Sequence, residues 1–277
     1  MSGARLVRLC GCAAVRLCGC AAVRLCGCAA VRPLWTRVPP PASTFARERP
    51  SCRTRLVRRT PPRPLPSPGP AIRQLAARLR RLPPSCGPVR LVGIDGHAGS
   101  GKSTFAGRLA EALDGAPVLR LDDIASHDEL FGWTERLLTQ VIEPFGRGTT
   151  AHYSPYDWRT RRFGPPRALP PAPVVLIEGV GAGRRAVRPH LACLLWLDLP
   201  PETAWARGRS RDGEEQREFW DGWVPAEEDH FSRDPSKPYA DVLVRQLEEG
   251  YEVLAGPVGD LRPHQDVTHR EGPAAMW

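Results

Sequence analysis

"LVGIDGHAGSGKSTFAGRLAEAL", residues 91–113, joins an apolar, β-branched run to an amphipathic helical pattern through a turn rich in glycine. The turn contains the complete G-x-x-x-x-G-K-[ST] pattern between a predicted strand and a predicted helix. Gly96, Gly99 and Gly101 let several backbone N–H groups point at one anion, and the N-terminus of the helix adds partial positive charge. The stretch predicts a phosphate-binding loop, and the complete pattern disfavours a turn that only packs a helix on a strand.

Lys102 in this turn is one of only two lysines, whereas the other 37 basic residues are arginines. A compact ammonium on a flexible stem can enter a tight loop and follow a phosphate through transfer, whereas a guanidinium is larger and planar. We expect the Ser103 hydroxyl on a Mg²⁺ ion that bridges two phosphates. The predicted cofactors are Mg²⁺ and a nucleoside triphosphate, nominally ATP, because the loop alone does not distinguish a kinase from an ATPase or a GTPase. The predicted nucleotide-binding residues of the loop are Gly96, His97, Ala98, Gly99, Ser100, Gly101, Lys102, Ser103 and Thr104.

Charge is distributed unevenly along the 277 residues, whose formal net charge is +9. Residues 1–65 contain thirteen arginines and one acid, so the remaining chain has 26 basic and 29 acidic residues. Residues 66–277, which have slightly more acidic than basic residues, therefore lack the excess of positive charge that is typical of nucleic-acid-binding proteins. No apolar run approaches the ~20 residues that cross a bilayer. We expect no nucleic-acid or membrane partner, a small-molecule substrate and, because few cysteines lie outside one repeat, a reduced cytoplasmic setting. A homo-oligomer is left open.

The first 70 residues form a low-complexity leader. "VRLCGCAA" occurs three times over residues 7–30, and proline is dense from Pro33 to Pro70. Proline at this density is incompatible with continuous helix or inner strands. A duplicated unstructured leader, an organelle transit peptide and a thiolate metal site are the three interpretations. The predicted organisation is a disordered leader over 1–70, one domain over 71–247 and a tail over 248–277.

Apolar β-rich runs alternate with helical patterns in the middle of the chain, which is typical of a parallel sheet covered by helices. We therefore predict a three-layer α/β fold of the P-loop NTPase type with a five-stranded parallel sheet. The expected strands are 89–94, 118–121, 174–177, 194–197 and 242–244. The expected helices are 71–82, 102–113, 127–145, 201–209 and 214–231, the last with a break near Pro225. Residues 146–173 read as a long loop, and such loops are usually functional.

Acidic residues follow two of these strands, at the edge where ligands bind in open α/β sheets. "VLRLDD" ends with Asp122 and Asp123, and "VVLIEG" contains Glu178. One acid can accept a proton from an incoming hydroxyl while another orients Mg²⁺. We assign Asp122 to catalysis and place it with Glu178 near the metal, whereas Asp123 serves equally well as a helix cap. The chain has no asparagine, so the guanine-reading Asn-Lys-x-Asp segment of GTPases is missing.

Three arginines occupy alternate positions in "WARGRSRDGEE". Charge runs are commonly solvated surface. In a phosphotransferase the same cluster can close over the nucleotide and neutralise charge on the moving phosphoryl group. On this second reading, Arg207 and Arg211 are catalytic and Arg209 binds the nucleotide.

Taken together, residues 89–244 resemble the uridine kinase branch of the P-loop kinases, which includes phosphoribulokinase-like enzymes. Asp122 falls where that family has its catalytic aspartate, and "IEGV" with Glu178 looks like its "EGI" motif. "YSPYDWRTRRFG" is similar to the substrate segment "P-x-YDF-x-x-H-x-R", and "PSKPYADVLV" resembles the ending "PTKxxADxIxP". The resemblance implies a kinase that phosphorylates a hydroxyl of a small metabolite, nominally the 5′-hydroxyl of a nucleoside. Substrate contacts are implied for Tyr156, Trp158 and Arg161.

Two departures bear on the acceptor. Arg161 replaces a histidine that helps to hold the base in uridine kinases, and Gly132 replaces the aspartate of "FDH" that binds the ribose hydroxyls. Sites that read a hydroxyl through a buried acceptor lose much affinity without it. Arg161 or Arg162 would suit a phosphorylated or carboxylated alcohol. Two other hypotheses follow: a nucleotide-binding module that has lost transfer chemistry and acts through a partner, and attachment to a membrane or nucleic acid through the basic leader.

Overall fold

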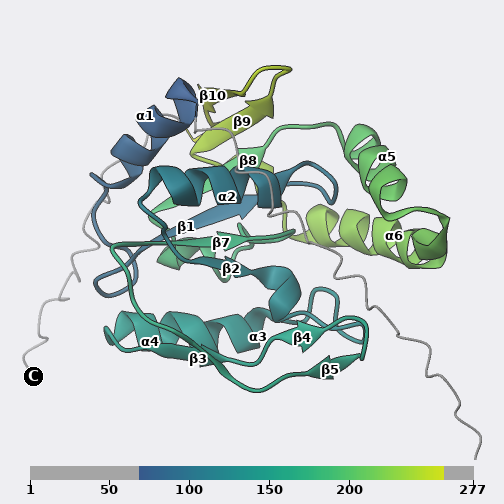
Figure 1. Ribbon diagram of the computed structural model, residues 1–277, viewed down its shortest axis with the longest axis horizontal. Helices are drawn as coiled ribbons and strands as arrows, with labels where there is room; N and C mark the ends of the chain where they lie inside the picture. Colours follow the sequence, from purple (N-terminus) through teal and green to yellow (C-terminus); the bar gives the residue numbers. More distant parts are fainter. Residues whose placement is uncertain (1–68, 259–277) are drawn as a thin grey trace, which may run out of the picture. The chain divides into compact units, whose positions relative to one another are not determined.

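The computed structural model describes residues 69–258, so the repeat and all but the last two residues of the predicted leader lie outside the described residues. Six strands form the main sheet in the order β10-β9-β8-β1-β7-β2 (Figure 1). Within this sheet β1, β2, β7, β8 and β9 are parallel to one another, and β10 pairs antiparallel with β9. Their bounds are β1 (Arg90–Asp95), β2 (Val118–Arg120), β7 (Val174–Glu178), β8 (Cys193–Leu197), β9 (Val242–Gln246) and β10 (Tyr251–Ala255).

Both faces of the sheet are buried, because side chains along its strands alternate between two cores. Leu91 of β1 joins the core under α3 (Thr134–Leu137), a π-helical segment (Leu138–Ile142) and α4 (Glu143–Gly146). Its neighbour Val92 joins the core under α1 (Pro70–Leu79) and α2 (Lys102–Ala112). Figure 1 shows these two helical layers on opposite sides of the sheet. The three-layer α/β fold with five parallel strands is confirmed.

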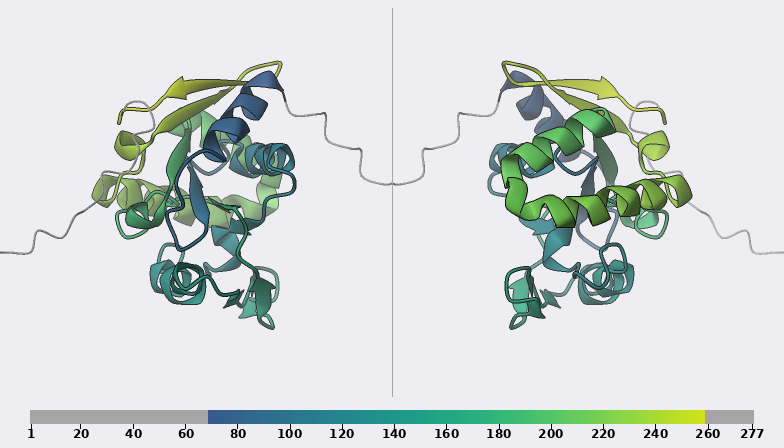
Figure 2. Two further views of the ribbon diagram at one scale, coloured as in Figure 1. Left: turned by 90° about the vertical axis from the view of Figure 1, so that its left-hand side faces the viewer. Right: turned by 90° about the vertical axis from the view of Figure 1, so that its right-hand side faces the viewer.

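A helical hairpin of α5 (Pro201–Asp212) and α6 (Arg217–Arg233) lies beside the end of the sheet to which the phosphate-binding turn belongs (Figures 1 and 2). The two helices approach closely at Gly208, where a Cβ would lie 2.3 Å from the Trp220 ring. Short 3-10 helices complete the helical elements: Leu121–Asp123, Arg188–His190, Glu214–Gln216 and Lys237–Tyr239. Among residues 69–258, no helix is both long enough and apolar enough to span a bilayer.

The structure differs from the sequence prediction at four places. The sheet continues past residue 247, because a turn at Gly250 (φ +96°) folds β10 back onto β9. The helix expected from residue 127 begins at Thr134. Pro225 does not break α6, whose continuous path is supported by the buried Trp220 and Trp223. The expected long loop contains two small hairpins: β3 (Ala151–Tyr153) with β6 (Arg167–Leu169), and β4 (Tyr156–Asp157) with β5 (Arg162–Phe163).

Candidate active site

The phosphate-binding turn leaves β1 and enters α2 through three glycines in left-handed or related conformations. The φ angles of Gly96, Gly99 and Gly101 are +143°, +84° and +94°. Residues that have a Cβ atom rarely adopt such positive values. Gly99 is also constrained by contact, since a Cβ there would lie 2.0 Å from the carbonyl oxygen of Ala204 in α5. The turn is thus pressed directly against α5.

Lys102 is buried at the start of α2 and closes the turn on itself. Its Nζ donates to the carbonyl oxygens of Gly96 at 2.8 Å and His97 at 2.9 Å. Only 8% of the lysine is exposed, yet it lines a cavity of about 440 Å³. The ammonium is therefore held at the cavity wall by acceptors that an incoming phosphate oxygen can replace.

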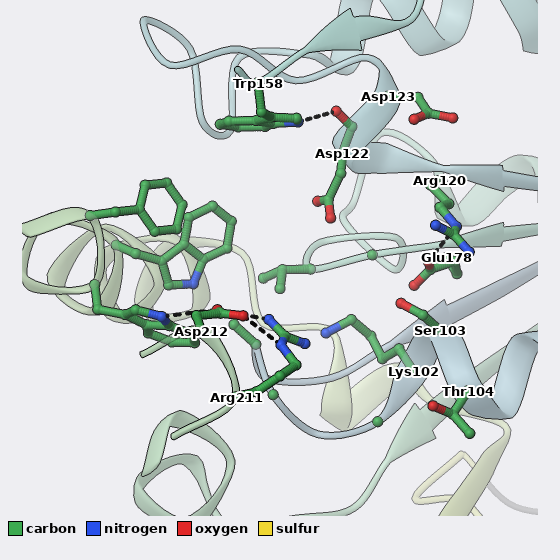
Figure 3. A pocket seen from close by; sticks show the side chains of 18 residues that line it. Lys102, Ser103, Thr104, Arg120, Asp122, Asp123, Trp158, Glu178, Arg211 and Asp212 are labelled. Carbon is green, nitrogen blue, oxygen red and sulfur yellow. Dashed lines mark hydrogen bonds and ion pairs between the residues drawn. The ribbon is translucent and has the colours of Figure 1, made fainter. Parts of the chain in front are cut away.

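This cavity brings together most of the residues predicted from the sequence (Figure 3). The phosphate-binding turn forms one wall of the cavity, and carboxylates at the tips of β2 and β7 lie on the opposite wall. The predicted residues that line it are Ala98, Gly99, Gly101, Lys102, Ser103, Thr104, Asp122, Trp158, Glu178 and Arg211. Acids on neighbouring strand tips consequently share one cavity with the lysine of the loop.

Other predicted residues are directed elsewhere. Arg209 forms an ion pair with Asp221 at 3.1 Å. Arg207 donates to the Gln246 side chain at 3.1 Å and lines a second cavity of about 270 Å³, together with Ser100. Arg161 is exposed and is not among the residues that line the main cavity.

Tyr156 and His97 are anchors of local packing. Tyr156 is buried, its hydroxyl lies 3.0 Å from His127 Nδ1, and it is not among the residues that line the cavity. His97 turns toward α6, where its Nδ1 lies 2.7 Å from a carboxylate oxygen of Glu227. Gly96 contributes backbone only, and the buried Asp95 beside it accepts hydrogen bonds from three backbone N–H groups, which braces the turn.

Glu178 is a buried carboxylate at the tip of β7, with 4% of the residue exposed. Burial raises its pKa, the charge of Lys102 lowers it, and the negative charge of Asp122 raises it again. A hydrogen bond from Ser103 and the charge of Arg120, 3.6 Å away, also favour the ionised form. The Glu178 carboxylate at the tip of β7 and the Ser103 hydroxyl in the first turn of α2 lie beside each other at the cavity wall (Figure 3).

Asp122 follows β2 and directs its carboxylate toward Lys102, whereas the carboxylate of Asp123, which also lines the cavity, is directed away from Lys102 (Figure 3). Reduced hydration raises the pKa of Asp122, and the positive charges of Lys102, Arg120 and Arg211 oppose this effect. The residue remains open to the cavity, so water offsets part of the increase. The result is a carboxylate whose proton affinity is higher than usual and which three cations keep available as a base.

An aromatic wall faces these carboxylates, and of its four residues only Trp158 was predicted from the sequence. It consists of Trp158, Phe219, Trp220 and Trp223. Phe219 and Trp223 stack with ring centroids 5.6 Å apart, and Trp158 meets Phe219 edge-on at 6.2 Å. The signal was present in "EFWDGW", where aromatic residues at i, i+1 and i+4 of a helix form one broad face.

Every indole N–H in this wall already has an acceptor. Trp158 donates to the Asp122 carbonyl at 2.9 Å, Trp220 to Asp212 at 3.1 Å and Trp223 to Glu227 at 2.7 Å. Arg211 is likewise held by Asp212, with two hydrogen bonds of 2.6 and 2.9 Å. The wall therefore presents ring surfaces to the cavity, and its polar atoms point outward into the protein.

No protein-family model and no curated protein matches the chain. Among solved structures, it is similar to one described as a possible uridine kinase from Bacillus stearothermophilus, with 22% identity over 62% of this chain and 96% of that one and a TM-score of 0.42. A protein from Silicibacter sp. TM1040, proposed to be a fructose transport system kinase, gives 22% identity, 61% and 91% coverage and a TM-score of 0.38. A structure from Thermus thermophilus is 23% identical over 59% of this chain and 91% of that one, with a TM-score of 0.32. At these low scores, function has to be argued from the cavity itself.

Proposed function

We propose that the chain is a kinase that transfers the γ-phosphoryl group of ATP to a hydroxyl of a small molecule. One observation carries the proposal: Lys102 of the phosphate-binding turn and the strand-tip acids Asp122 and Glu178 open into the same cavity. A nucleotide-binding module needs only the turn. A base and a second acid across from it are what phosphoryl transfer to an alcohol adds.

The nucleotide half of the cavity fits a triphosphate. The positive φ angles of Gly99 and Gly101 let the backbone of the turn wrap around an anion, and the N-terminus of α2 borders the same cavity. Lys102 would exchange its two carbonyl acceptors for phosphate oxygens. Mg²⁺ bound with ATP would neutralise phosphate charge, and the oxygen ligands that suit it are Ser103 and Glu178.

Asp122 is the proposed general base. Its carboxylate would accept the proton of the acceptor hydroxyl while that oxygen bonds to the γ-phosphorus and the bond from the γ-phosphorus to the β,γ-bridging oxygen of ATP breaks, leaving ADP. Arg211, fixed by Asp212, would face the charge that develops on the transferred group. Arg120 pairs with Glu178 and adds a second positive charge on the far side.

The acceptor half of the cavity favours an uncharged alcohol that carries a flat ring. Trp158, Phe219 and Trp223 offer ring surfaces. Within the described residues, the two arginines of the cavity already have carboxylate partners, and Arg161 does not line it. The sequence argument for an anionic acceptor, which relied on Arg161, is therefore weakened. A nucleoside meets the remaining requirements, and the sequence resemblance nominates it.

Turnover of the full chain with MgATP tests the proposal, using nucleosides, sugars and carboxylated alcohols as acceptors. A phosphorylated product from a ring-bearing alcohol is expected. Asp122→Asn should then lower kcat by about 10² to 10⁴-fold, while Asp123→Asn, whose carboxylate lines the cavity but is directed away from Lys102 (Figure 3), should cause a much smaller decrease. MgADP affinity should be similar in both variants, because neither removes a loop contact.

Loss of ATP without any phosphorylated acceptor would contradict the proposal. Tight MgADP binding without turnover by the unsubstituted chain would instead favour the module that acts through a partner. The two outcomes are separated by measuring nucleotide binding and product formation on the same preparation.

A further inference from the structure

Glu227 lies in the middle of α6 and is fully buried, with 0% of the residue exposed. It faces the phosphate-binding turn. One carboxylate oxygen lies 2.7 Å from His97 Nδ1, and the other accepts the backbone N–H of Ala98 at 3.1 Å. Two consecutive residues of the turn are therefore attached to a single side chain of the helical hairpin.

The same carboxylate also holds both helices of the hairpin. It accepts the indole N–H of Trp205 in α5 at 3.0 Å and that of Trp223 in α6 at 2.7 Å. Trp223 lines the acceptor half of the cavity. Glu227 thus contacts a residue of the aromatic wall and two residues of the nucleotide half at once.

Glu227 remains an ionised acceptor in this setting. Burial alone raises its pKa, but the hydrogen bond from His97, the charge of Lys102 and the hydrogen bonds from Trp223 and Ala98 together lower it. A buried carboxylate surrounded by donors is sensitive to their positions, because each lost donor leaves part of a charge unsatisfied. Displacement of the turn would therefore change the hydrogen bonds that Glu227 accepts from Trp205 and Trp223.

Lys102 provides the step that would displace the turn. Its Nζ donates to the His97 carbonyl, while the His97 ring is held by Glu227. When the ammonium turns to a phosphate, that carbonyl loses its donor and the backbone of residues 97–98 is free to shift. Such a shift would reach Glu227 through its two hydrogen bonds with the turn, and from there Trp205 and Trp223.

We propose that Glu227 is a positioning residue that links occupancy of the phosphate-binding turn to the placement of Trp205 and Trp223, and thereby couples the nucleotide half of the cavity to its acceptor half. The inference rests on the proposed function, since it assumes that the turn binds a nucleotide. Coupling of this kind requires that the ligand favours one arrangement of the helices over another. A carboxylate that only braces the fold would give no ligand-dependent change in α5 or α6.

Hydrogen exchange of the full chain with and without MgADP tests the link, with calorimetry as the measure of MgADP binding. In the unsubstituted protein, MgADP should slow amide exchange in the turn and also in α5 and α6. Glu227→Gln keeps the shape of the side chain but removes its charge and one acceptor. This variant should still bind MgADP and protect the turn, but lose the ligand-induced protection of α6.

Single-donor variants give a second test that does not depend on the folding of Glu227→Gln. Trp205→Phe should lose the ligand-induced protection of α5 and retain that of α6, and Trp223→Phe should show the reverse. Trp196→Phe is the matched control, because the Trp196 ring packs against His97 with centroids 5.3 Å apart and belongs to the core. It should leave both responses unchanged.

Full protection of α5 and α6 in Glu227→Gln, or in both single-donor variants, would overturn the link while leaving the proposed function in place. The same conclusion follows if the unsubstituted protein binds MgADP and protects only the turn. Failure of the unsubstituted protein to bind MgADP would remove both the proposed function and this inference.

Discussion

The two halves of the cavity are built by different means. The nucleotide half comes from one continuous segment, residues 96–104, and offers backbone N–H groups, a helix N-terminus and one lysine. The acceptor half is assembled from side chains of the β4–β5 hairpin, α6 and the tip of β2, including Trp158, Phe219 and Asp122. Backbone geometry determines the first half, whereas side-chain packing determines the second.

This difference separates two kinds of sensitivity to substitution. A backbone cradle depends on φ angles and on the space around its glycines, so small additions there displace the groups that bind. An aromatic wall depends on ring surface, so its side chains can be exchanged at modest cost and with altered acceptor preference. Substitutions in the first half should change nucleotide binding strongly, and those in the second should change the acceptor selectively.

Gly99→Ala should have the largest effect on nucleotide binding among these tests of the comparison. The added methyl group would meet the Ala204 carbonyl oxygen at 2.0 Å, and the backbone would have to hold φ near +84°. Overpacking of this kind costs about 1–3 kcal/mol, which corresponds to a decrease in MgADP affinity of about 5- to 150-fold. Isothermal titration with MgADP measures the change.

Gly107→Ala in the adjoining helix α2 is the matched control. A Cβ at Gly107 has no neighbouring atom within 4 Å, and alanine in a helix interior stabilises by about 0.5–1 kcal/mol relative to glycine. MgADP affinity should stay the same while the midpoint of thermal unfolding rises. Equal affinity in Gly99→Ala and Gly107→Ala would show that the cradle does not depend on its contact with α5.

The nucleotide half could be predicted because its determinants are local. A strand, a glycine turn and a helix follow one another in the sequence, and carboxyl ends of parallel strands share an edge, so Asp122 and Glu178 could be placed opposite Lys102 before any coordinates. The five parallel strands were predictable for the same reason: each is a short apolar run. The antiparallel β10 was missed because its pairing depends on the turn at Gly250.

The acceptor half depends on contacts between distant segments. Tyr156 could have lined the cavity, but its ring is buried and its hydroxyl lies 3.0 Å from Nδ1 of His127, which belongs to a separate segment. Arg209 was predicted with Arg211, although alternate positions of a helix lie on nearly opposite faces. Helical periodicity alone therefore argued against their joint role, and the structure places Arg209 beside Asp221 instead.

Phe219→Leu should affect the acceptor half alone. Leucine removes the stacked contact with Trp223 and the edge contact with Trp158, and aromatic pairs contribute about 0.5–1.5 kcal/mol beyond the area they bury. The KM for a ring-bearing acceptor should rise about 2- to 12-fold, with MgADP affinity unchanged. Steady-state kinetics with the best acceptor of the panel, compared with Phe163→Leu on the exposed β5 strand, provides the measurement.

The smallest of these effects is the shift in the pH dependence of turnover that we expect in Arg211→Gln. As the proposed base, Asp122 can act only when it is deprotonated, so activity should fall as the pH drops through its pKa, which reduced hydration raises above the ordinary aspartate value of about 3.9. The positive charge of Arg211 lowers this pKa. Without that charge the pKa rises further, and the acid limb of the kcat profile should move to higher pH, whatever the loss in kcat itself. Arg209→Gln removes an equal charge, which is paired with Asp221 outside the cavity. The acid limb of the kcat profile of this variant should therefore stay in place. An acid limb that moves equally in both variants would mean that general surface charge, and not Arg211, sets the proton affinity of Asp122.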